Sequence, residues 1–300
     1  MSVDGVLVLN KPAGISSAAC VGRIRRRFGQ KKTGHAGTLD PLATGVLLIL
    51  LGQATKIAGL LMEGGEKIYS GVIRFGLSTD TWDAEGKIIS ESALTKALTQ
   101  EALSGALADL LGESLQEVPS YSAAKYQGRP LYALARQGVF APVKTKTVKI
   151  SRAELEWFRP PLARFRVACG SGTYIRSLAH SLGKRFECGA TLMELTREYS
   201  HPFGLEEAVA LEELDSWTSI PAERVFGLQK ALPHIPPLTL NADLCRRARN
   251  GRPLPAETLP RLDTERAFFL DESGRVLALA QKHREQGRET WIIGRGLWND

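Results

Sequence analysis

Asp40 is the residue of this chain whose surroundings most favour chemistry. It is the single acid of the segment GHAGTLDPLATGVLLIL (34–50), where glycines permit a tight turn, Pro41 fixes the exit of the chain and an apolar run follows. A carboxylate at the edge of an apolar floor is a stronger nucleophile or base than one in water, provided that a nearby cation keeps it ionised. An aspartate in a turn also commonly caps its own backbone, so both interpretations stay open at this point.

Other chemistries that use such residues do not fit. A P-loop requires GxxxxGK followed by Ser or Thr, and the segment has no lysine there. Aspartyl phosphatases place the nucleophile before a Gly-Thr unit, whereas Asp40 follows one. The four cysteines and five histidines show no CxxC or HxxxH spacing, so we expect no metal site and no disulfide framework. Buried reduced thiols fit a cytoplasmic protein.

Positive charge is concentrated in three stretches that contain no acid. The formal net charge is +7, and residues 5–39, 118–153 and 158–186 carry seven, seven and six Lys or Arg side chains, respectively. Acidic residues gather in 76–117 and 204–223 instead. Because a solvated surface normally mixes both signs, these stretches indicate a face for a polyanion if the fold brings them together. RNA or DNA is the favoured class of partner.

Mixed strands and helices must position these residues. Patterning predicts strands at 6–10, 45–52, 67–76, 146–150, 154–158, 163–169 and 191–200, and helices at 18–28 (capped by Ser16 or Ser17) and 91–111. Residues 170–186 are predicted to form a glycine-rich turn that leads into a helix capped by Thr173. A polar basic loop at 121–138 ends in a short helix. Without a regular βαβ rhythm, this order favours an α+β fold with a largely antiparallel sheet.

A proline-rich segment, LPHIPPLTL (232–240), separates two expected domains. We expect a larger domain at 1–235 and a small β-rich module at 241–300. The N-terminus lacks the apolar core of a signal peptide, and no apolar run reaches the roughly 18 residues of a membrane span. We therefore expect a cytoplasmic protein that does not bind membranes. The sequence shows no heptads or exposed apolar stripe, so we expect a monomer.

Five blocks of sequence follow one another in a specific order. They are NKPAGISS (10–17), GHAGTLDPLATGVLLILLGQATK (34–56), KIYSGVIRFGLSTDTWDAEG (67–86), VPSYSAAKYQGRPLYALARQG (118–138) and GSGTYIRSLAHSLG (170–183). Together they resemble the bacterial tRNA pseudouridine-55 synthase family, the TruB type. The resemblance covers roughly residues 5–215, and the tail from about residue 241 is similar, more weakly, to the PUA-like module of that family.

The resemblance implies a pseudouridine-synthase fold with a PUA-like RNA-binding module. It implies an isomerase that converts the uridine at position 55, in the TΨC loop of tRNA, to its C-glycosidic isomer without a cofactor or a metal. The target base must be flipped into a pocket, at a cost of a few kcal/mol of stacking. Basic side chains that hold the phosphates offset this cost.

The resemblance assigns roles to matching positions. Asp40 matches the catalytic aspartate, which acts at the ribose by attack at C1′ or by removal of a proton from C2′. Tyr69 matches the tyrosine that stacks on the flipped base, and Arg176 matches the arginine paired with the aspartate. Tyr174 and Leu195 match positions that line the uridine pocket.

Four further positions match residues that bind or support. His35 matches the histidine that fills the space left by the flipped base. Lys11 and Pro12 match a block that supports the floor of the site, and Thr38 belongs to the turn that presents Asp40. The loop at 121–136 matches the segment that closes over the T-arm of tRNA.

Two alternatives remain beside the enzyme. One is a non-catalytic tRNA-binding protein or folding chaperone on the same scaffold, and the other is a synthase for a different uridine in tRNA or rRNA. The trio Asp40, Tyr69 and Arg176 is intact, which favours an enzyme. The chain departs from the usual family pattern at Ser16, Val118, Ser181, Thr196 and Glu198.

Overall fold

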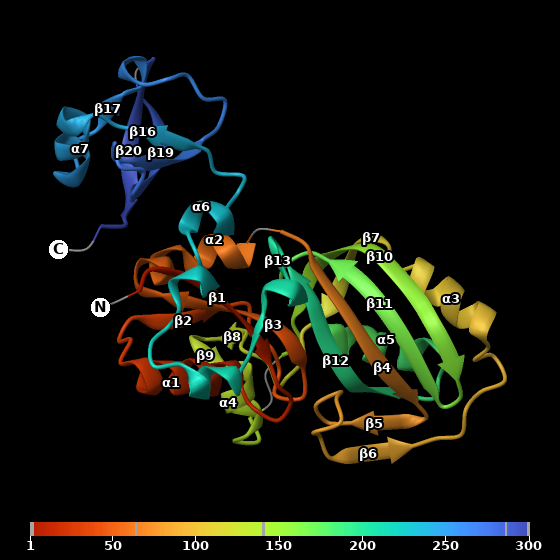
Figure 1. The fold of residues 1–300 in the computed structure, drawn as a ribbon. Helices are drawn as coiled ribbons and strands as arrows, with labels where there is room; N and C mark the ends of the chain where they lie inside the picture. Colours follow the sequence, from red (N-terminus) through yellow and green to blue (C-terminus); the bar gives the residue numbers. More distant parts are fainter. Residues whose placement is uncertain (1–2, 64, 140–141, 286, 299–300) are drawn as a thin grey trace.

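Most strands of the chain belong to one large sheet (Figure 1). The structure is a computed structural model that describes residues 3–63, 65–139, 142–285 and 287–298. Within these ranges no helix is long and apolar enough to cross a membrane. The strands of the large sheet are β1 (Gly5–Lys11), β2 (Thr33–Ala36), β3 (Thr44–Leu51), β4 (Lys67–Phe75), β7 (Gly112–Glu117), β10 (Thr145–Arg159), β11 (Leu162–Cys169), β12 (Ala190–Ser200), β13 (Phe203–Gly204), β14 (Val209–Ala210) and β15 (Val225–Phe226).

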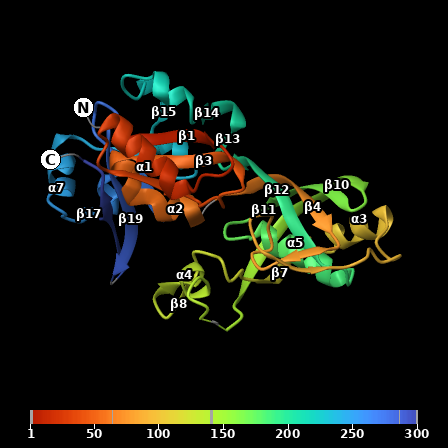
Figure 2. The same ribbon diagram turned by 90° about the horizontal axis from the view of Figure 1, so that it is seen from below.

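The large sheet has two halves. β14, β1 and β3 form the first half, and β12, β4, β11, β10 and β7 form the second. The halves join where β12 runs parallel to β3, through the pairs Thr196–Thr44 and Arg197–Gly45. Figures 1 and 2 show the two halves side by side around this junction. Most other pairs in the sheet are antiparallel, so the predicted α+β fold with a largely antiparallel sheet is confirmed.

Helices and two small hairpins surround this sheet. The hairpin of β8 (Lys125–Tyr126) and β9 (Arg129–Pro130), followed by the short helix α4 (Leu131–Ala135), lies beside the junction of the two halves (Figure 2). The helices are α1 (Ser17–Phe28), α2 (Ala58–Glu63), α3 (Gln100–Ala108), α4 (Leu131–Ala135), α5 (Ile175–Arg185), α6 (Leu228–Ala231) and α7 (Ala242–Arg249), and the hairpins are β5 (Leu77–Thr79) with β6 (Ile88–Glu91) and β8 (Lys125–Tyr126) with β9 (Arg129–Pro130).

Both faces of the first half are buried, which explains the apolar run after Asp40. On β3, Leu47 faces the core cluster that includes Ile24 of α1, whereas its neighbour Leu48 faces the cluster that includes Phe268. A strand covered on both sides needs apolar side chains at consecutive positions rather than at alternate ones. The run therefore forms a rigid central strand behind the loop that carries Asp40.

A second, smaller sheet lies in the C-terminal part of the chain. It packs onto the first half of the large sheet, because Phe268 and Leu279 share a core cluster with residues of β1, β3 and α6. We keep the division into domains at 1–235 and 241–300 as a proposal. Residues 1–2, 64, 140–141, 286 and 299–300 lie outside the described residues. The strands of the small sheet are β16 (Pro237–Thr239), β17 (Leu254–Pro255), β18 (Arg266–Leu270), β19 (Val276–Glu285) and β20 (Arg288–Gly296).

Local predictions near the site are largely confirmed. Ser16 caps α1, since its hydroxyl accepts a hydrogen bond from the backbone N–H of Ala19 at 3.2 Å. The strands predicted at 146–150 and 154–158 are parts of one long strand, β10. Shifts in its pairing with β11 occur at Ile150/Arg152 and Leu155/Trp157, where bulges interrupt the alternation that a single strand would show.

The helix predicted at 91–111 is wrong in extent. Only Gln100–Ala108 is helical, and Thr99 caps it by accepting from the N–H of Ala102 at 3.2 Å. The preceding residues are held by tertiary contacts: the Ser92 N–H donates to the carbonyl of Gly76, and the Thr95 hydroxyl donates to the carbonyl of Phe186. These contacts outweigh the helix propensity of the segment.

Gly45, at the junction of the halves, gives a prediction for stability. Its φ is +99°, and a Cβ added there would lie 2.2 Å from the carbonyl oxygen of Arg197. We expect Gly45→Ala to lower the free energy of unfolding by about 3 kcal/mol, because backbone strain and a clash with β12 add together. Urea denaturation followed by circular dichroism measures the change.

Gly128→Ala is the matched control. Gly128 has a φ of +81°, but a Cβ there would meet nothing within 4 Å. Backbone strain alone should then lower the free energy of unfolding of this variant by about 1 kcal/mol. Equal losses in the two variants would contradict the close approach of β3 to β12.

Candidate functional site

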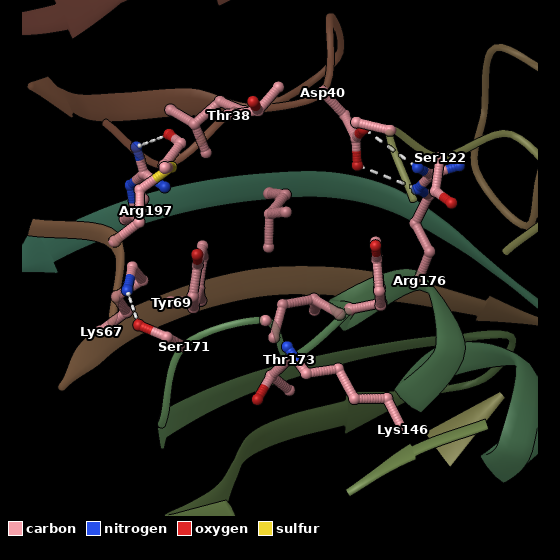
Figure 3. A pocket seen from close by; sticks show the side chains of 18 of the residues that line it. Thr38, Asp40, Lys67, Tyr69, Ser122, Lys146, Ser171, Thr173, Arg176 and Arg197 are labelled. Carbon is pink, nitrogen blue, oxygen red and sulfur yellow. Dashed lines mark hydrogen bonds and ion pairs between the residues drawn. The ribbon is translucent and has the colours of Figure 1, made fainter. Parts of the chain in front are cut away.

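A cavity of about 620 Å³ opens at the junction of the two halves (Figure 3). Its walls are the loop before Asp40, strands β4 and β12, helix α2, the turn into α5 and the segment around Ser122. Its volume lies in the range of sites for small ligands. Six of the predicted site residues line it: Thr38, Asp40, Tyr69, Tyr174, Arg176 and Leu195.

The three acid-free stretches all contribute to this cavity. Thr38 comes from the first stretch, Lys146 from the second and Ser171 from the third, and each lines the cavity wall. The fold therefore brings parts of the three stretches to one cavity, where Lys146 and Arg176 contribute positive charge from the second and third.

The loop that carries Asp40 is fixed from behind by two buried side chains. Lys11 is fully buried, and its ammonium group donates to the carbonyls of Pro12 and Ile15, both at 2.7 Å, and of Pro41 at 3.1 Å. The hydroxyl of Ser17 accepts from the Leu39 N–H at 2.9 Å and lies 3.0 Å from the Leu39 carbonyl. Lys11 and Pro12 thus support the loop from beneath, and the carboxylate of Asp40 is presented to the cavity.

Arg176, in the first turn of α5, holds the carboxylate in a bidentate contact. Its Nε donates to Oδ2 of Asp40 at 2.9 Å and its Nη2 to Oδ1 at 3.0 Å (Figure 3). The remaining donors reach the backbone carbonyls of Thr81 and Tyr121, both at 3.0 Å. The Arg176 side chain is 4% exposed and that of Asp40 is 34% exposed, so the guanidinium is buried while the carboxylate it holds faces the cavity.

A second carboxylate, Asp83, shares this arginine. Its Oδ2 lies 3.4 Å from Nη1 of Arg176, and its Oδ1 accepts from the Thr81 hydroxyl at 2.5 Å. Burial raises the pKa of Asp40 above its ordinary value, Arg176 opposes this shift, and the charge of Asp83 raises the pKa further. One cation between two carboxylates therefore leaves Asp40 a stronger base than an aspartate whose arginine is not shared.

Tyr69 and Leu195 form the apolar part of the wall. Tyr69 is 7% exposed on β4, and Leu195 is 6% exposed on the adjacent strand β12. Tyr174 stands just before α5, packed against the cluster of Val118 and Leu131. An aromatic ring and an aliphatic side chain in one wall suit the flat faces of a nucleobase.

His35 is a neighbour of the cavity and is not among its lining residues. It lies on β2, and its Nε2 is 3.1 Å from the hydroxyl of Thr38, which does line the cavity. Burial, and then the charge of Arg197, lower the pKa of His35 below its ordinary value. The imidazole is accordingly neutral at neutral pH.

Sequence reasoning missed two basic residues of the cavity, Lys67 and Arg197. Lys67 donates to the hydroxyl of Ser171 at 2.7 Å, and Arg197 donates to the carbonyls of Val46 at 2.7 Å and Gly37 at 2.8 Å. The alternation of side chains between the two faces of a strand was the signal that could have found them. Lys67 is in phase with Tyr69 on β4, and Arg197 is in phase with Leu195 on β12.

Ser122 is another residue that the sequence did not single out. It is 5% exposed, lines the cavity and lies next to Tyr121, whose carbonyl accepts from Arg176. Its hydroxyl has no hydrogen-bond partner among the described residues. An unsatisfied buried hydroxyl is costly, so a polar group of a bound molecule would find a partner here.

The predicted capping role of Thr173 is wrong. The N-cap of α5 is Tyr174, with no side-chain cap. The hydroxyl of Thr173 instead donates to the carbonyl of Gly170 at 2.9 Å and closes the glycine-rich turn, while the Tyr174 N–H donates to Gln116 of β7 at 2.7 Å. Tertiary contacts thus replace the local cap.

Comparison with known proteins decides the family. Residues 25–175 match the model of the TruB family pseudouridylate synthase (N terminal domain). The chain is 54% identical to tRNA pseudouridine synthase B of Oleidesulfovibrio alaskensis, over 98% of this chain and 96% of that protein. It is 51% identical to the protein of the same name from Nitratidesulfovibrio vulgaris strain Hildenborough, over 98% of both chains. The chain belongs to the TruB family.

Solved structures support the TruB-type fold. The crystal structure of a Cbf5-Nop10-Gar1 complex contains a chain that aligns with a TM-score of 0.73 at 22% identity, covering 98% of this chain and 85% of that one. A chain of an H/ACA RNP bound to a substrate RNA containing 2′-deoxyuridine aligns with a TM-score of 0.72 at 20% identity, with the same coverage. The alignments span both sheets, and they confirm the fold of a pseudouridine synthase with a PUA-like C-terminal module.

The shared arginine gives a prediction for the pKa of Asp40. In Asp83→Asn, a neutral amide replaces the charge that raises this pKa, so we expect the pKa of Asp40 to fall toward its ordinary value. Carboxyl ¹³C NMR of aspartate-labelled protein measures it directly. The deprotonated form of Asp40 should then persist to lower pH than in the unsubstituted protein.

Asp80→Asn is the control on the same turn. Asp80 accepts from the Lys87 N–H at 2.8 Å, which an asparagine oxygen can also do. The pKa of Asp40 should not move in this variant. An unchanged pKa in Asp83→Asn, or equal shifts in both variants, would show that Asp83 does not act on Asp40 through Arg176.

Proposed function

We propose that this TruB-family chain is a tRNA pseudouridine synthase that isomerises the uridine at position 55 in the TΨC loop. The observation that carries the proposal is the carboxylate of Asp40, held by buried Arg176 at the wall of a cavity that also contains Tyr69. The names of the relatives of this chain point to the same activity.

Base flipping follows from the depth of the site. Tyr69 and Leu195 are buried in the cavity wall, so a base still stacked in an RNA loop could not contact Tyr69 while its ribose lies at Asp40. Extrusion costs a few kcal/mol of stacking. Tyr69 would recover part of this cost by stacking on the base, and the basic residues around the cavity would hold the phosphates.

Asp40 would act at the ribose. It either attacks C1′ to form an ester or removes a proton from C2′, and in both routes the C1′–N1 bond breaks with its electron pair passing to uracil. Reattachment through C5 gives the C-glycoside, the bond to Asp40 breaks or its proton returns, and the proton lost from C5 is balanced by one gained at N1. The raised pKa of Asp40 suits either route.

The other residues would bind and orient the nucleotide. Arg176 keeps Asp40 ionised and aimed, Tyr174 and Leu195 enclose the uridine, and His35 would fill the gap in the RNA loop from its place beside Thr38. The segment around α4 would close over the T-arm, and the C-terminal module would add RNA contacts. A monomeric, cytoplasmic enzyme stays a prediction.

A chaperone or pure RNA-binding protein is the alternative. Such a protein gains nothing from a carboxylate at the cavity wall, because a negative charge repels phosphate. The family membership and the Asp40–Arg176 pair together favour the enzyme.

The test uses tRNA that carries tritium at C5 of uridine, with EDTA and no added cofactor. Release of tritium reports that C5 has exchanged its hydrogen for a bond to C1′. Asp40→Asn should slow release by at least about 10⁴-fold, because the amide neither attacks nor removes a proton. The Kd for tRNA should stay within about threefold, because the proposed role of Asp40 at the ribose includes no contact with phosphate.

Asp109→Asn is the matched control. Asp109 lies at the end of α3 in an exposed pair with Arg185, and this variant should release tritium at the unsubstituted rate. No release by the unsubstituted protein, with tight tRNA binding, would favour the chaperone. Loss of both binding and turnover in Asp40→Asn would reduce Asp40 to a structural cap of its turn.

Position specificity has its own prediction. A tRNA transcript with cytidine in place of uridine 55 should release no tritium from its other labelled uridines, because only the T-loop nucleotide would reach the cavity. Mapping of pseudouridine in the unsubstituted transcript should give position 55. Unchanged release from the substituted transcript would mean that the enzyme acts on another uridine.

A further inference from the structure

Two buried cations, Lys67 and Arg197, lie in the cavity without a carboxylate partner among the residues that the structure describes. Lys67 is 7% exposed and Arg197 is 1% exposed. Their hydrogen bonds go to the hydroxyl of Ser171 and to the backbone carbonyls of Gly37 and Val46. In the parts of the chain that the structure describes, neither side chain forms an ion pair.

Such an arrangement is unfavourable in an empty site. Burying a charge costs several kcal/mol unless an opposite charge or a full set of hydrogen bonds compensates it. Burial, and then the charge of Arg197, lower the pKa of Lys67 to about 8; Cys169 opposes this shift, and Lys146 adds to it by less. Glu63 of α2 also lines the cavity, but among the described residues it forms no ion pair with Lys67 or Arg197, so an anion bound beside these two cations would compensate their charge.

The position of these cations relative to Asp40 indicates which anion. Lys67 and Tyr69 point to the same face of β4, two residues apart, and Arg197 lies opposite Tyr69 on β12. In Figure 3 the pair of Asp40 and Arg176 lies across the cavity from Lys67 and Arg197. Tyr69 lies beside the two cations, on the side that faces Asp40. A uracil ring stacked on Tyr69, with its ribose at Asp40, would turn its free edge toward Lys67.

The proposed reaction moves one negative charge in this direction. Asp40 is an anion before the C1′–N1 bond breaks, and it is neutral afterwards, as an ester or as an acid. The electron pair of the broken bond leaves with uracil, which becomes an anion with its charge shared among N1, O2 and O4. The transfer is the same for attack at C1′ and for removal of the C2′ proton.

We propose that Lys67, supported by Arg197, is the cation that stabilises the uracil anion after its detachment from the ribose. This inference rests on the proposed function. Preorganised cations placed where charge develops are among the strongest catalytic devices in a site that excludes water. Lys67 would then be a catalytic residue, and Arg197 a positioning and charge-supplying residue behind it.

A phosphodiester is the other anion to consider. The phosphates of a flipped nucleotide remain in the RNA backbone at the mouth of the cavity, whereas Lys67 and Arg197 are buried in its wall strands. Lys146 is exposed on β10 and lines the same cavity, which suits it better to phosphate. The buried pair is therefore assigned to the base.

The experiment compares uridine with 5-fluorouridine at position 55 of the RNA in single-turnover reactions, followed by loss of the parent nucleoside after digestion. Fluorine withdraws electrons and stabilises the uracil anion, so this base leaves with less help. Lys67→Met should slow the reaction of uridine by about 100-fold or more. The factor by which Lys67→Met slows the reaction of 5-fluorouridine should be about tenfold smaller. Lys67→Arg should recover much of the rate with uridine.

Two further measurements separate this role from a structural one. The thermal midpoint of Lys67→Met should rise, because the substitution removes an uncompensated buried charge and keeps the volume of the side chain. Lys146→Met removes a lysine charge from the same cavity. It should weaken tRNA binding and make that binding less dependent on salt. Its effect on the reaction should be the same for uridine and for 5-fluorouridine.

Three results would overturn the inference. Equal losses for uridine and 5-fluorouridine in Lys67→Met, together with weaker RNA binding and a shallower salt dependence, would assign Lys67 to a phosphate. A lower thermal midpoint would assign it to the fold, and an unchanged rate would leave it without a role. Inactivity of the unsubstituted protein toward uridine would instead refute the proposed function.

Discussion

The contact between Arg176 and Asp40 is the interaction on which the arrangement of the site depends. One buried guanidinium binds two carboxylates and two backbone carbonyls, from the loop before β3, the turn after β5 and the segment before β8. A cation in the first turn of a helix is opposed by the helix dipole, so these acceptors are needed to keep it buried. Without Arg176, these segments would lose their common partner at the cavity wall.

The same contact explains why the site lies between the two halves of the large sheet. Asp40 lies in the loop before β3 of the first half and Arg176 follows β11 of the second, while Arg197 of β12 reaches back to Gly37 and Val46. The halves share two register pairs of backbone and one apolar core cluster, which includes Leu47 of β3 and Leu192 of β12, and the buried charged side chains add to this connection. Charge is thus used both to join the halves and to give the cavity a distinct anionic and cationic side. In our proposals, the reaction uses this difference by moving negative charge from Asp40 to the base.

Much of this architecture could be predicted from the sequence, for identifiable reasons. The apolar run after Asp40 indicated a buried strand because burial on both faces leaves no polar position, and Ser16 indicated the start of α1 because its hydroxyl caps locally. The predictions of a helix at 91–111 and of a cap at Thr173 were wrong, because Phe186 and Gln116, which are distant in sequence, supply the hydrogen-bond partners of Thr95 and Tyr174. Lys67 and Arg197 were missed because a basic residue in a strand reads as exposed until the pairing of β4 with β12 is known.

The most direct test of the account is a crystal structure of the Asp40→Asn protein bound to an RNA stem-loop with the sequence of a T-arm. We predict that uridine 55 is flipped into the cavity, with its base stacked on Tyr69 and the free edge of uracil toward Lys67. C1′ of its ribose should lie beside the asparagine that replaces Asp40. A T-loop bound with uridine 55 still stacked in the RNA, or a base inserted with its ribose away from position 40, would contradict it.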